Sequence, residues 1–542
     1  MGNVLYNLTN PQKSIWDTEK VYPNTSIDNI AATAIIEDKV DFAFFSDAIN
    51  IFLQQHDAFR IKFITQNGET KQYVEPFSPL SFDIINVKSD KDVETLSDKA
   101  TNYVFNLENS MLCKFQLFKY PDGHGGIVLL VHHLISDAWS CGLFISEIID
   151  IYDKLMENKN VEIDSFSYID YITAENEYMK SPKFEKDKLY WMEKFETIPE
   201  IATIPSMNEA TDFSSKAKRK TFKIPESTIN IISEFCKNNK ISIYNFFMGV
   251  YSIYLSRVNN LSDFVIGTPV LNRSNAKEKH TIGMFISVVP FKIHVDQNEN
   301  YLEFISKVSS EFFDVFRHQK YPYQTLLEDL RRTHSNIPNL YNIMISYQNM
   351  RTNKQSTKTN YSAKWHFSNH ISDDIDIHFF DINDTGTIDL AYDYKTSKYS
   401  IDDIYILHSR ILHIINQILI RPEIIIKDIE IITPDEKDDI LNKFNNTELN
   451  YPKDKSVVQI FNEQVIKNPD GVAVVYKNQT LTYKELNNKA NQLGNYLQEA
   501  GVSSGTIVPV LLNRSIDLIV AMLAIIKVGR SLFTTIYRIS NR

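Results

Sequence analysis

Three titratable side chains lie close together in the sequence: His132, His133 and Asp137. Histidine exchanges a proton near neutral pH and a carboxylate can orient it, so this spacing suits general acid–base catalysis. His and Asp are also zinc ligands, but no HExxH or CxxC cluster completes such a site. The simplest alternative is two ordinary histidines followed by a helix cap.

The histidine pair ends a predicted buried strand. Residues 127–131 are apolar and follow a run of turn formers at 121–126. Successive strand residues point to opposite faces, so we expect one histidine to face packing and the other a cavity. Ser136 and Asp137 predict a helix N-terminus. A buried Asp137 would need a cationic partner.

Residues 1–175 read as one α/β lobe. The spacing predicts a helix over 46–55, an alternating strand over 59–64, and a hairpin formed by 112–120 and 127–131. On the alternating strand, Arg60 would project from a half-buried surface and seek a carboxylate. The alternative is a solvated arginine at the sheet edge.

Residues 176–432 predict a second α/β lobe, with helices over 243–254 and 302–316 and strands near 264–269, 341–347 and 388–392. Residues 433–455 turn polar, which is typical of a linker. A separate fold begins at 456 and extends to 542, with a predicted strand at 472–476 and a helix opening at 481–486.

Composition excludes several classes of protein. The chain has 542 residues, a net charge of −11 and dispersed Lys and Arg, which argues against a nucleic-acid binder. Three widely spaced cysteines predict buried thiols in a reducing compartment. The N-terminus does not resemble a signal peptide, and the longest apolar run, 518–526, is too short to cross a bilayer. We therefore expect a soluble cytoplasmic protein without a membrane partner.

Residues 132–140, HHLISDAWS, resemble the HHxxxDGxS signature of nonribosomal peptide synthetase condensation domains, with Ala138 where the family usually has glycine. Further motifs of that family appear in the family's order. They are LTNPQKSIW at 8–16, HDAFRIKF at 56–63, YIDY at 168–171, IGMFISVVP at 282–290 with Ser287 in place of Asn, and HQKYPY at 318–323.

This resemblance implies two chloramphenicol-acetyltransferase-like lobes arranged as a V, with the reaction centre at their junction. It implies that Arg60 pairs with Asp137 beneath the histidines. We expect His133 to hold the acceptor amine and take its proton, while His132 and Asp137 support the architecture. Ser140, in the same motif, is expected to support the site. Gly283 and Ser287 would lie near the substrate tunnel.

The implied function is peptide-bond formation between a donor acyl or peptidyl thioester and an acceptor aminoacyl thioester. Both would be carried on phosphopantetheine arms of carrier proteins, and the chain itself would bind no cofactor. The alternatives are a related HHxxxD acyltransferase or epimerase, or a non-catalytic remnant that only docks carriers. A chain-initiating subtype is expected because the condensation motifs begin the polypeptide.

Residues 456–542 resemble the N-terminal edge of an adenylation domain, an adenylate-forming fold, that stops early. No glycine-rich phosphate loop occurs in the sequence, so we expect no ATP-dependent amino-acid activation. The segment has too few partners to bury a full core, and we expect it to be poorly anchored. A downstream adenylation domain is expected if the gene continues.

Overall fold

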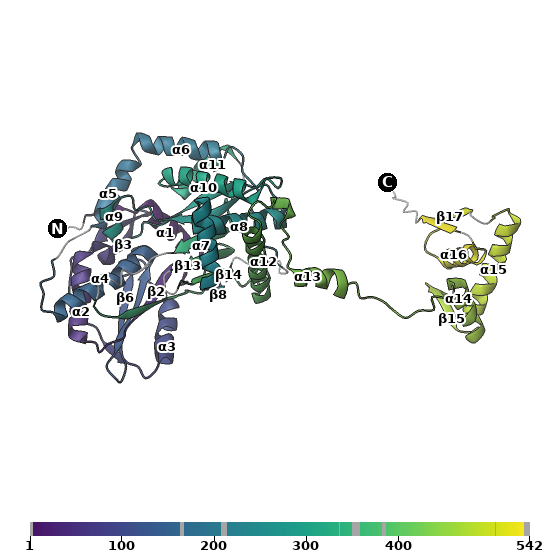
Figure 1. Ribbon diagram of the computed structural model, residues 1–542, viewed down its shortest axis with the longest axis horizontal. Coiled ribbons are helices and arrows are strands. Elements are labelled where there is room, and N and C mark those ends of the chain that lie inside the picture. The colour runs from purple at the N-terminus through teal and green to yellow at the C-terminus, as the bar shows by residue number, and fades with distance from the viewer. Residues whose placement is uncertain are drawn as a thin grey trace. The chain divides into compact units, whose positions relative to one another are not determined.

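The predicted strand before the histidines lies inside a sheet. The structure, a computed structural model, describes residues 4–162, 167–206, 214–334, 337–348, 358–381, 386–503 and 506–529, and the backbone of β18 (Ser531–Thr535). The chain divides into two compact units, Met1–Lys437 and Asp438–Arg542. The elements of both are labelled in Figure 1.

In the first unit, β7 (Gly125–His132) is buried along its whole length. It pairs antiparallel with β6 (Cys113–Lys119), which confirms the predicted hairpin, and with β2 (Asn29–Ile36). The backbones of β7 and β2 approach so closely at Gly126 that a Cβ there would lie 1.9 Å from the Ala34 carbonyl oxygen. Glycine is therefore needed at that position.

This five-stranded sheet has the order β12-β2-β7-β6-β5, with β5 at Ile84–Asn86. Its edge strand β12 (Tyr361–His366) comes from the second half of the chain and pairs antiparallel with β2. The apolar core under the sheet includes side chains from α2 (Phe42–Gln55) and α4 (Ala138–Met156). A segment far along the sequence thus completes the first sheet.

Arg60 does not lie on a strand. It ends a 3-10 helix, Asp57–Arg60, and the strand β3 (Ile61–Gln66) begins at the next residue. The alternation predicted over 59–64 is therefore wrong at its first two residues. β3 belongs to a small sheet of order β1-β4-β3, with β1 at Tyr6–Asn7 and β4 at Glu69–Val74.

The second lobe is built on a six-stranded sheet of order β10-β9-β11-β13-β14-β8. One face of the sheet contributes the apolar side chains of β11, β13 and β14 to a core shared with three long helices, and the other face carries polar residues. The bounds are β8 Ala217–Ile224, β9 Asp263–Val270, β10 Ser287–His294, β11 Ile343–Gln348, β13 Ile375–Phe380, β14 Ile388–Lys395, α8 Ile243–Asn259, α10 Tyr301–Arg317 and α12 Ile401–Ile420.

Each of the three cysteines of the chain is buried in one of the two lobes, as predicted.

The remaining elements of the first unit are helical. The helices are α1 Asn10–Val21, α3 Asp90–Thr101, α5 Tyr168–Tyr178, α6 Pro182–Lys194, α7 Glu226–Asn239, α9 Ala276–His280, α11 Tyr323–Thr333 and a 3-10 turn at Ile426–Asp428.

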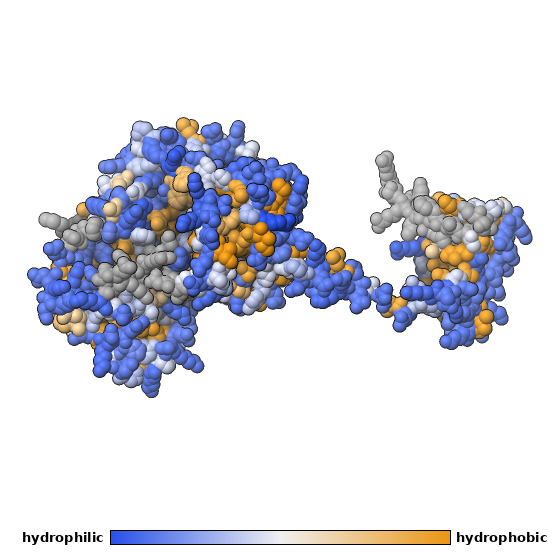
Figure 2. Space-filling model, in the orientation of Figure 1, coloured by the Kyte–Doolittle hydropathy of each residue, from blue (hydrophilic) through white to orange (hydrophobic). Residues whose placement is uncertain are grey.

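The second unit has little interior. Its buried apolar residues form two small clusters, one around Leu486 and Ile516 and one around Val510 and Ile525. Apolar side chains remain on its surface, visible as orange patches in Figure 2. Its bounds are α13 Pro434–Asp438, where the first unit ends, a π-helical turn Asp439–Lys443, α14 Val457–Lys467, β15 Val472–Tyr476, β16 Gln479–Thr482, α15 Tyr483–Glu499, β17 Ile507–Leu511 and α16 Ile516–Lys527.

Among the helices in the described ranges, none is long and apolar enough to cross a membrane.

Candidate functional site

His133 is the first residue after β7, and the residue as a whole is half-buried. Its backbone N–H donates to the Asp28 carbonyl oxygen at 2.8 Å, which fixes the chain where it leaves the sheet. Its Nδ1 is buried and has no hydrogen-bond partner in the described part of the chain. Burial lowers the pKa of His133 to about 4, and the attraction of Asp137 offsets this only in part. The imidazole is therefore neutral at pH 7.

His132 has a different environment, as strand alternation predicts. Its ring is buried, its Nε2 lies 3.1 Å from Glu19 Oε1 on α1, and its Nδ1 accepts from the Leu134 N–H at 3.2 Å. Phe105 packs edge-on against the ring. Since both ring nitrogens are occupied, His132 links α1 to the end of β7.

Asp137 is the N-cap of α4 and is fully buried, as its position before the helix predicts. It accepts from the Ser140 N–H at 2.8 Å and the Phe285 N–H at 3.0 Å. The buried Arg273 guanidinium donates to both of its oxygens, at 2.8 and 3.1 Å. Burial would raise the pKa of Asp137, but Arg273 and these hydrogen bonds hold it below the ordinary value.

The cation that pairs with Asp137 is Arg273, so the predicted Arg60–Asp137 pair is wrong. Arg60 donates from Nε to the Leu53 carbonyl at 3.0 Å and from Nη1 to the Glu75 carbonyl at 2.7 Å. The 3-10 turn that precedes β3 directs its guanidinium to the end of α2 instead. Arg273 lies in the loop after β9, 136 residues from Asp137, and no local spacing signals their contact.

Ser140 links the Asp137–Arg273 pair to the segment around Gly283 by hydrogen bonds. Its Oγ donates to the Gly283 carbonyl at 2.8 Å and accepts from the Gly283 N–H at 3.0 Å and from Arg273 at 2.8 Å. Gly283 has φ +152°, and a Cβ there would lie 2.1 Å from the Tyr168 ring. Only glycine fits, so both residues have structural roles at the junction of the lobes.

Ala138 begins α4 with helical geometry. The glycine that is usual in the family is therefore not needed at this position for a positive φ.

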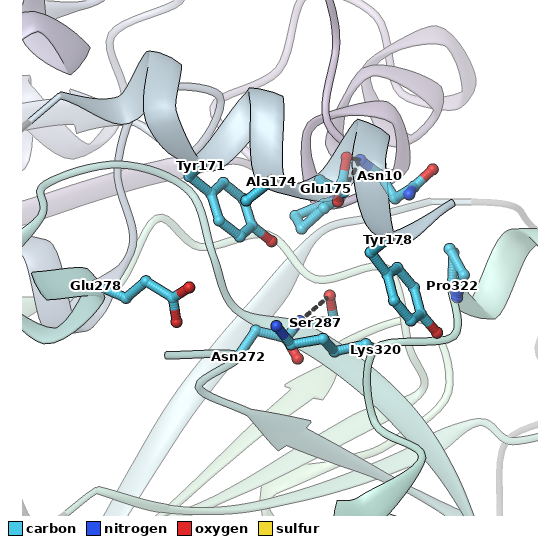
Figure 3. A pocket seen from close by; sticks show the side chains of 11 residues that line it. Asn10, Tyr171, Ala174, Glu175, Tyr178, Asn272, Glu278, Ser287, Lys320 and Pro322 are labelled. Atoms are coloured by element: carbon cyan, nitrogen blue, oxygen red, sulfur yellow. Dashed lines mark hydrogen bonds between the residues drawn. The ribbon is translucent and has the colours of Figure 1, made fainter. Parts of the chain in front are cut away.

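Ser287 lies beside a small cavity between α5 and the second lobe, shown in Figure 3. It accepts a hydrogen bond from Asn272 Nδ2 at 2.8 Å. Across the cavity, Glu175 accepts from the Asn10 N–H at 2.9 and 3.2 Å. Burial nevertheless raises the pKa of Glu175 to about 7, although Asn10 and nearby lysines oppose the shift. The cavity thus holds an acid that titrates near neutrality.

Within the described ranges, no three His, Cys, Asp or Glu side chains converge as metal ligands. The site itself presents a neutral imidazole on a fixed loop.

Comparison with known families divides the chain in two. Residues 3–441 match the condensation domain, and residues 461–538 match the AMP-binding enzyme family. Surfactin synthase subunit 1 of Bacillus subtilis (strain 168) is 33% identical over 98% of this chain. Bacitracin synthase 3 of Bacillus licheniformis is 27% identical over 97%. The chain spans 15% and 8% of the length of these two relatives.

Solved structures show the same fold. A four-domain nonribosomal peptide synthetase bound to AMP and glycine matches 98% of this chain and 41% of its own, with a TM-score of 0.82 and 17% identity. The starter condensation domain of rhizomide synthetase, in complex with C8-CoA, matches 79% of this chain and 98% of its own, with a TM-score of 0.69 and 19% identity.

Proposed function

The chain belongs to the condensation-domain family of nonribosomal peptide synthetases, and from this we propose that it joins a donor acyl or peptidyl thioester to an acceptor aminoacyl thioester. The acceptor amine attacks the donor carbonyl, a C–N bond forms and the C–S bond breaks. The released thiolate takes up the proton that the amine loses. Both substrates arrive on phosphopantetheine arms of carrier proteins.

One observation supports the role of His133 in this reaction. His133 is the half-buried member of the histidine pair, whereas His132 is fully buried, and burial keeps the His133 ring neutral. An α-amino group has a pKa near 8, so its deprotonation at pH 7 costs only about 1.4 kcal/mol and needs no strong base. A neutral imidazole can accept a hydrogen bond from the amine and then its proton. Such help is worth about 10² to 10⁴ in rate.

The residues around His133 position it. His132 has both nitrogens engaged and Asp137 is saturated by donors, so neither is free to exchange protons with a substrate. We propose that His132, Asp137 and Ser140 support the loop. Arg273, in place of Arg60, is the cation that pairs with Asp137. The fastening of Ser140 to Gly283 ties this loop to the segment that ends at Ser287, beside which substrate would pass.

The partners follow from the reaction. We infer one donor and one acceptor carrier protein, each docking to the first unit. The match of residues 461–538 to the AMP-binding family supports an adenylation domain that continues from this segment.

A single-turnover assay with a donor-loaded and an acceptor-loaded carrier tests the proposal. Wild-type protein should form the amide product. The variant His133→Ala should lose at least about 100-fold in rate with an unchanged melting temperature. The matched control is His124→Ala, at a partly exposed turn between β6 and β7, which should keep the rate.

Three outcomes would contradict parts of this proposal. Carrier binding without product from wild-type protein would support the docking remnant. Change of stereochemistry on a single aminoacyl carrier would support the epimerase. Full activity of His133→Ala would remove His133 from the mechanism.

A further inference from the structure

A second group of chemically active side chains lies on the sheet of the second lobe, outside the site described above. Ser346 on β11, His378 on β13 and Asp393 on β14 occupy three adjacent strands; β13 and β14 lie side by side in Figure 1. Ser346 and His378 are directly opposite each other in the strand register. The three side chains belong to the polar face of this sheet, away from the helices.

The hydrogen bonds form a chain. Ser346 Oγ lies 2.6 Å from His378 Nδ1, and His378 Nε2 lies 3.2 Å from Asp393 Oδ2. Arg219, on β8, completes it by donating to both oxygens of Asp393 at 2.7 and 2.6 Å. Phe367 and Phe380 cover the Arg219 guanidinium at 4.8 and 5.4 Å. The arginine is thereby held in one orientation, with its charge on Asp393.

The direction of each hydrogen bond follows from Asp393. Burial would raise its pKa, but Arg219 and His378 hold it below the ordinary value, so it is ionised and can only accept. His378 therefore donates from Nε2. In the neutral ring Nδ1 is left as an acceptor, and the Ser346 hydroxyl can donate to it. An imidazole that is oriented by a carboxylate and accepts from a serine hydroxyl is the arrangement that activates serine as a nucleophile.

Access to this group is narrow. Ser346 is 4% exposed, and the side chain of His378 is 12% exposed. A substrate for this hydroxyl must therefore be a slender extended group, such as an acyl thioester, because a folded partner could not approach it. None of the four residues contacts Asp137 or Arg273, so the group can be altered without removing a contact of the first site.

We propose that Ser346 is an activated nucleophile that accepts acyl groups from thioesters. In the first step Ser346 Oγ forms a C–O bond to the thioester carbonyl and its proton passes to His378 Nδ1. The C–S bond breaks, and the leaving thiolate takes that proton. Water then attacks the ester, which restores the serine hydroxyl and releases a carboxylic acid. The net reaction is hydrolysis of a thioester, so the site would remove acyl groups that are not condensed.

A second serine–histidine pair in the chain, without a carboxylate among the described residues, is a control for the role of Asp393. Ser215 Oγ lies 2.8 Å from His370 Nδ1, so a second buried serine contacts a histidine in the same way. No Asp or Glu forms an ion pair with His370 in the part of the chain that the structure describes. The proposal therefore expects Ser346, but not Ser215, to be reactive.

A fluorophosphonate probe tests this on the full chain, since serine attack on phosphorus displaces fluoride and leaves a stable adduct. Peptide mass mapping should find the adduct on Ser346 and none on Ser215. The variants His378→Gln and Asp393→Asn should each lower the labelling rate at least about tenfold. The variant His133→Ala should label like wild type, which separates this result from the condensation reaction.

A short acyl thioester of N-acetylcysteamine provides the second arm. Wild-type protein should release the free acid, and Ser346→Ala should release it no faster than buffer does. Near-ultraviolet circular dichroism shows whether each variant is folded. If Asp393→Asn does not fold, His378→Gln alone tests whether the serine is activated. Absence of the Ser346 adduct in folded wild-type protein would overturn the proposal, as would equal labelling of Ser215.

Discussion

Two buried carboxylates, Asp137 and Asp393, are each held by an arginine that donates to both oxygens, and each lies near a histidine. At the lobe junction, the side chains of Asp137 and Arg273 are 0% exposed and the carboxylate also caps α4. On the second sheet, Arg219 is 24% exposed and Asp393 accepts from His378.

The two regions show that an arginine–aspartate pair can have two different structural roles. Asp137 accepts from backbone N–H groups and from Arg273, so it fixes a loop and, among the described residues, does not hydrogen-bond a histidine. Asp393 instead reaches a histidine directly and orients its ring toward a hydroxyl. The two carboxylates thus differ in their remaining partners, which are backbone N–H groups at Asp137 and a histidine at Asp393.

The largest expected effect is at the lobe junction. Asp137→Ala or Arg273→Leu leaves the other charge buried and unpaired, which costs about 3–5 kcal/mol. Urea denaturation should show this loss of unfolding free energy. The matched control Asp170→Ala removes an exposed ion pair with Lys277 and should change stability by less than about 1 kcal/mol. A loss below about 1 kcal/mol for Asp137→Ala would show that the buried pair does not hold the lobes.

A smaller loss is expected on the second sheet. Arg219→Met should lower the unfolding free energy by about 1–3 kcal/mol, because the arginine is partly solvated and His378 still contacts Asp393. Thermal melts of this variant and Arg273→Leu, measured side by side, give the ranking. Equal losses would mean that solvent access does not distinguish the two pairs.

Glu175 is a third carboxylate and differs from Asp137 and Asp393. Burial raises its pKa to about 7, and no arginine is among the groups that offset this shift. An acid whose pKa is raised on folding stabilises the protein below its unfolded value of about 4.5, and this contribution is lost as pH rises through 7. Glu175→Gln should therefore be more stable than wild type at pH 8 by about 1–2 kcal/mol, and no more stable at pH 4.

Urea denaturation at the two pH values measures this difference. Glu278→Gln, across the same cavity, is the control and should not share the pH dependence. A Glu175→Gln variant that is less stable at pH 8 would show that the carboxylate is ionised and needed.

The smallest effect is expected at Arg60, where a double-mutant cycle tests the corrected pairing. Arg60→Leu removes two hydrogen bonds to backbone carbonyls and should cost about 1 kcal/mol. Combined with Asp137→Ala, its effect should add within about 0.5 kcal/mol. Arg273→Leu with Asp137→Ala should instead fall well short of the sum. Strong coupling of Arg60 to Asp137 would restore the first pairing.

Local patterns predicted much of what surrounds His133. The apolar run before it does form a strand, Asp137 does cap a helix, and the two histidines do differ in environment. Each of these depends on neighbours within a few residues, where the period of a strand or the donors of a helix end leave few choices. The family motifs likewise predicted the fold that solved condensation domains share with this chain.

The sequence by itself indicated the buried strand before the histidines, the helix that begins after Asp137 and the family to which the chain belongs. Only the tertiary structure decided which arginine meets Asp137, and that Arg219 meets Asp393 across 174 residues. Periodicity specifies the face on which a side chain lies, but it does not specify the partner that another strand or loop brings to that face. The family resemblance implied that Arg60 pairs with Asp137, but a single turn of 3-10 helix directs Arg60 elsewhere.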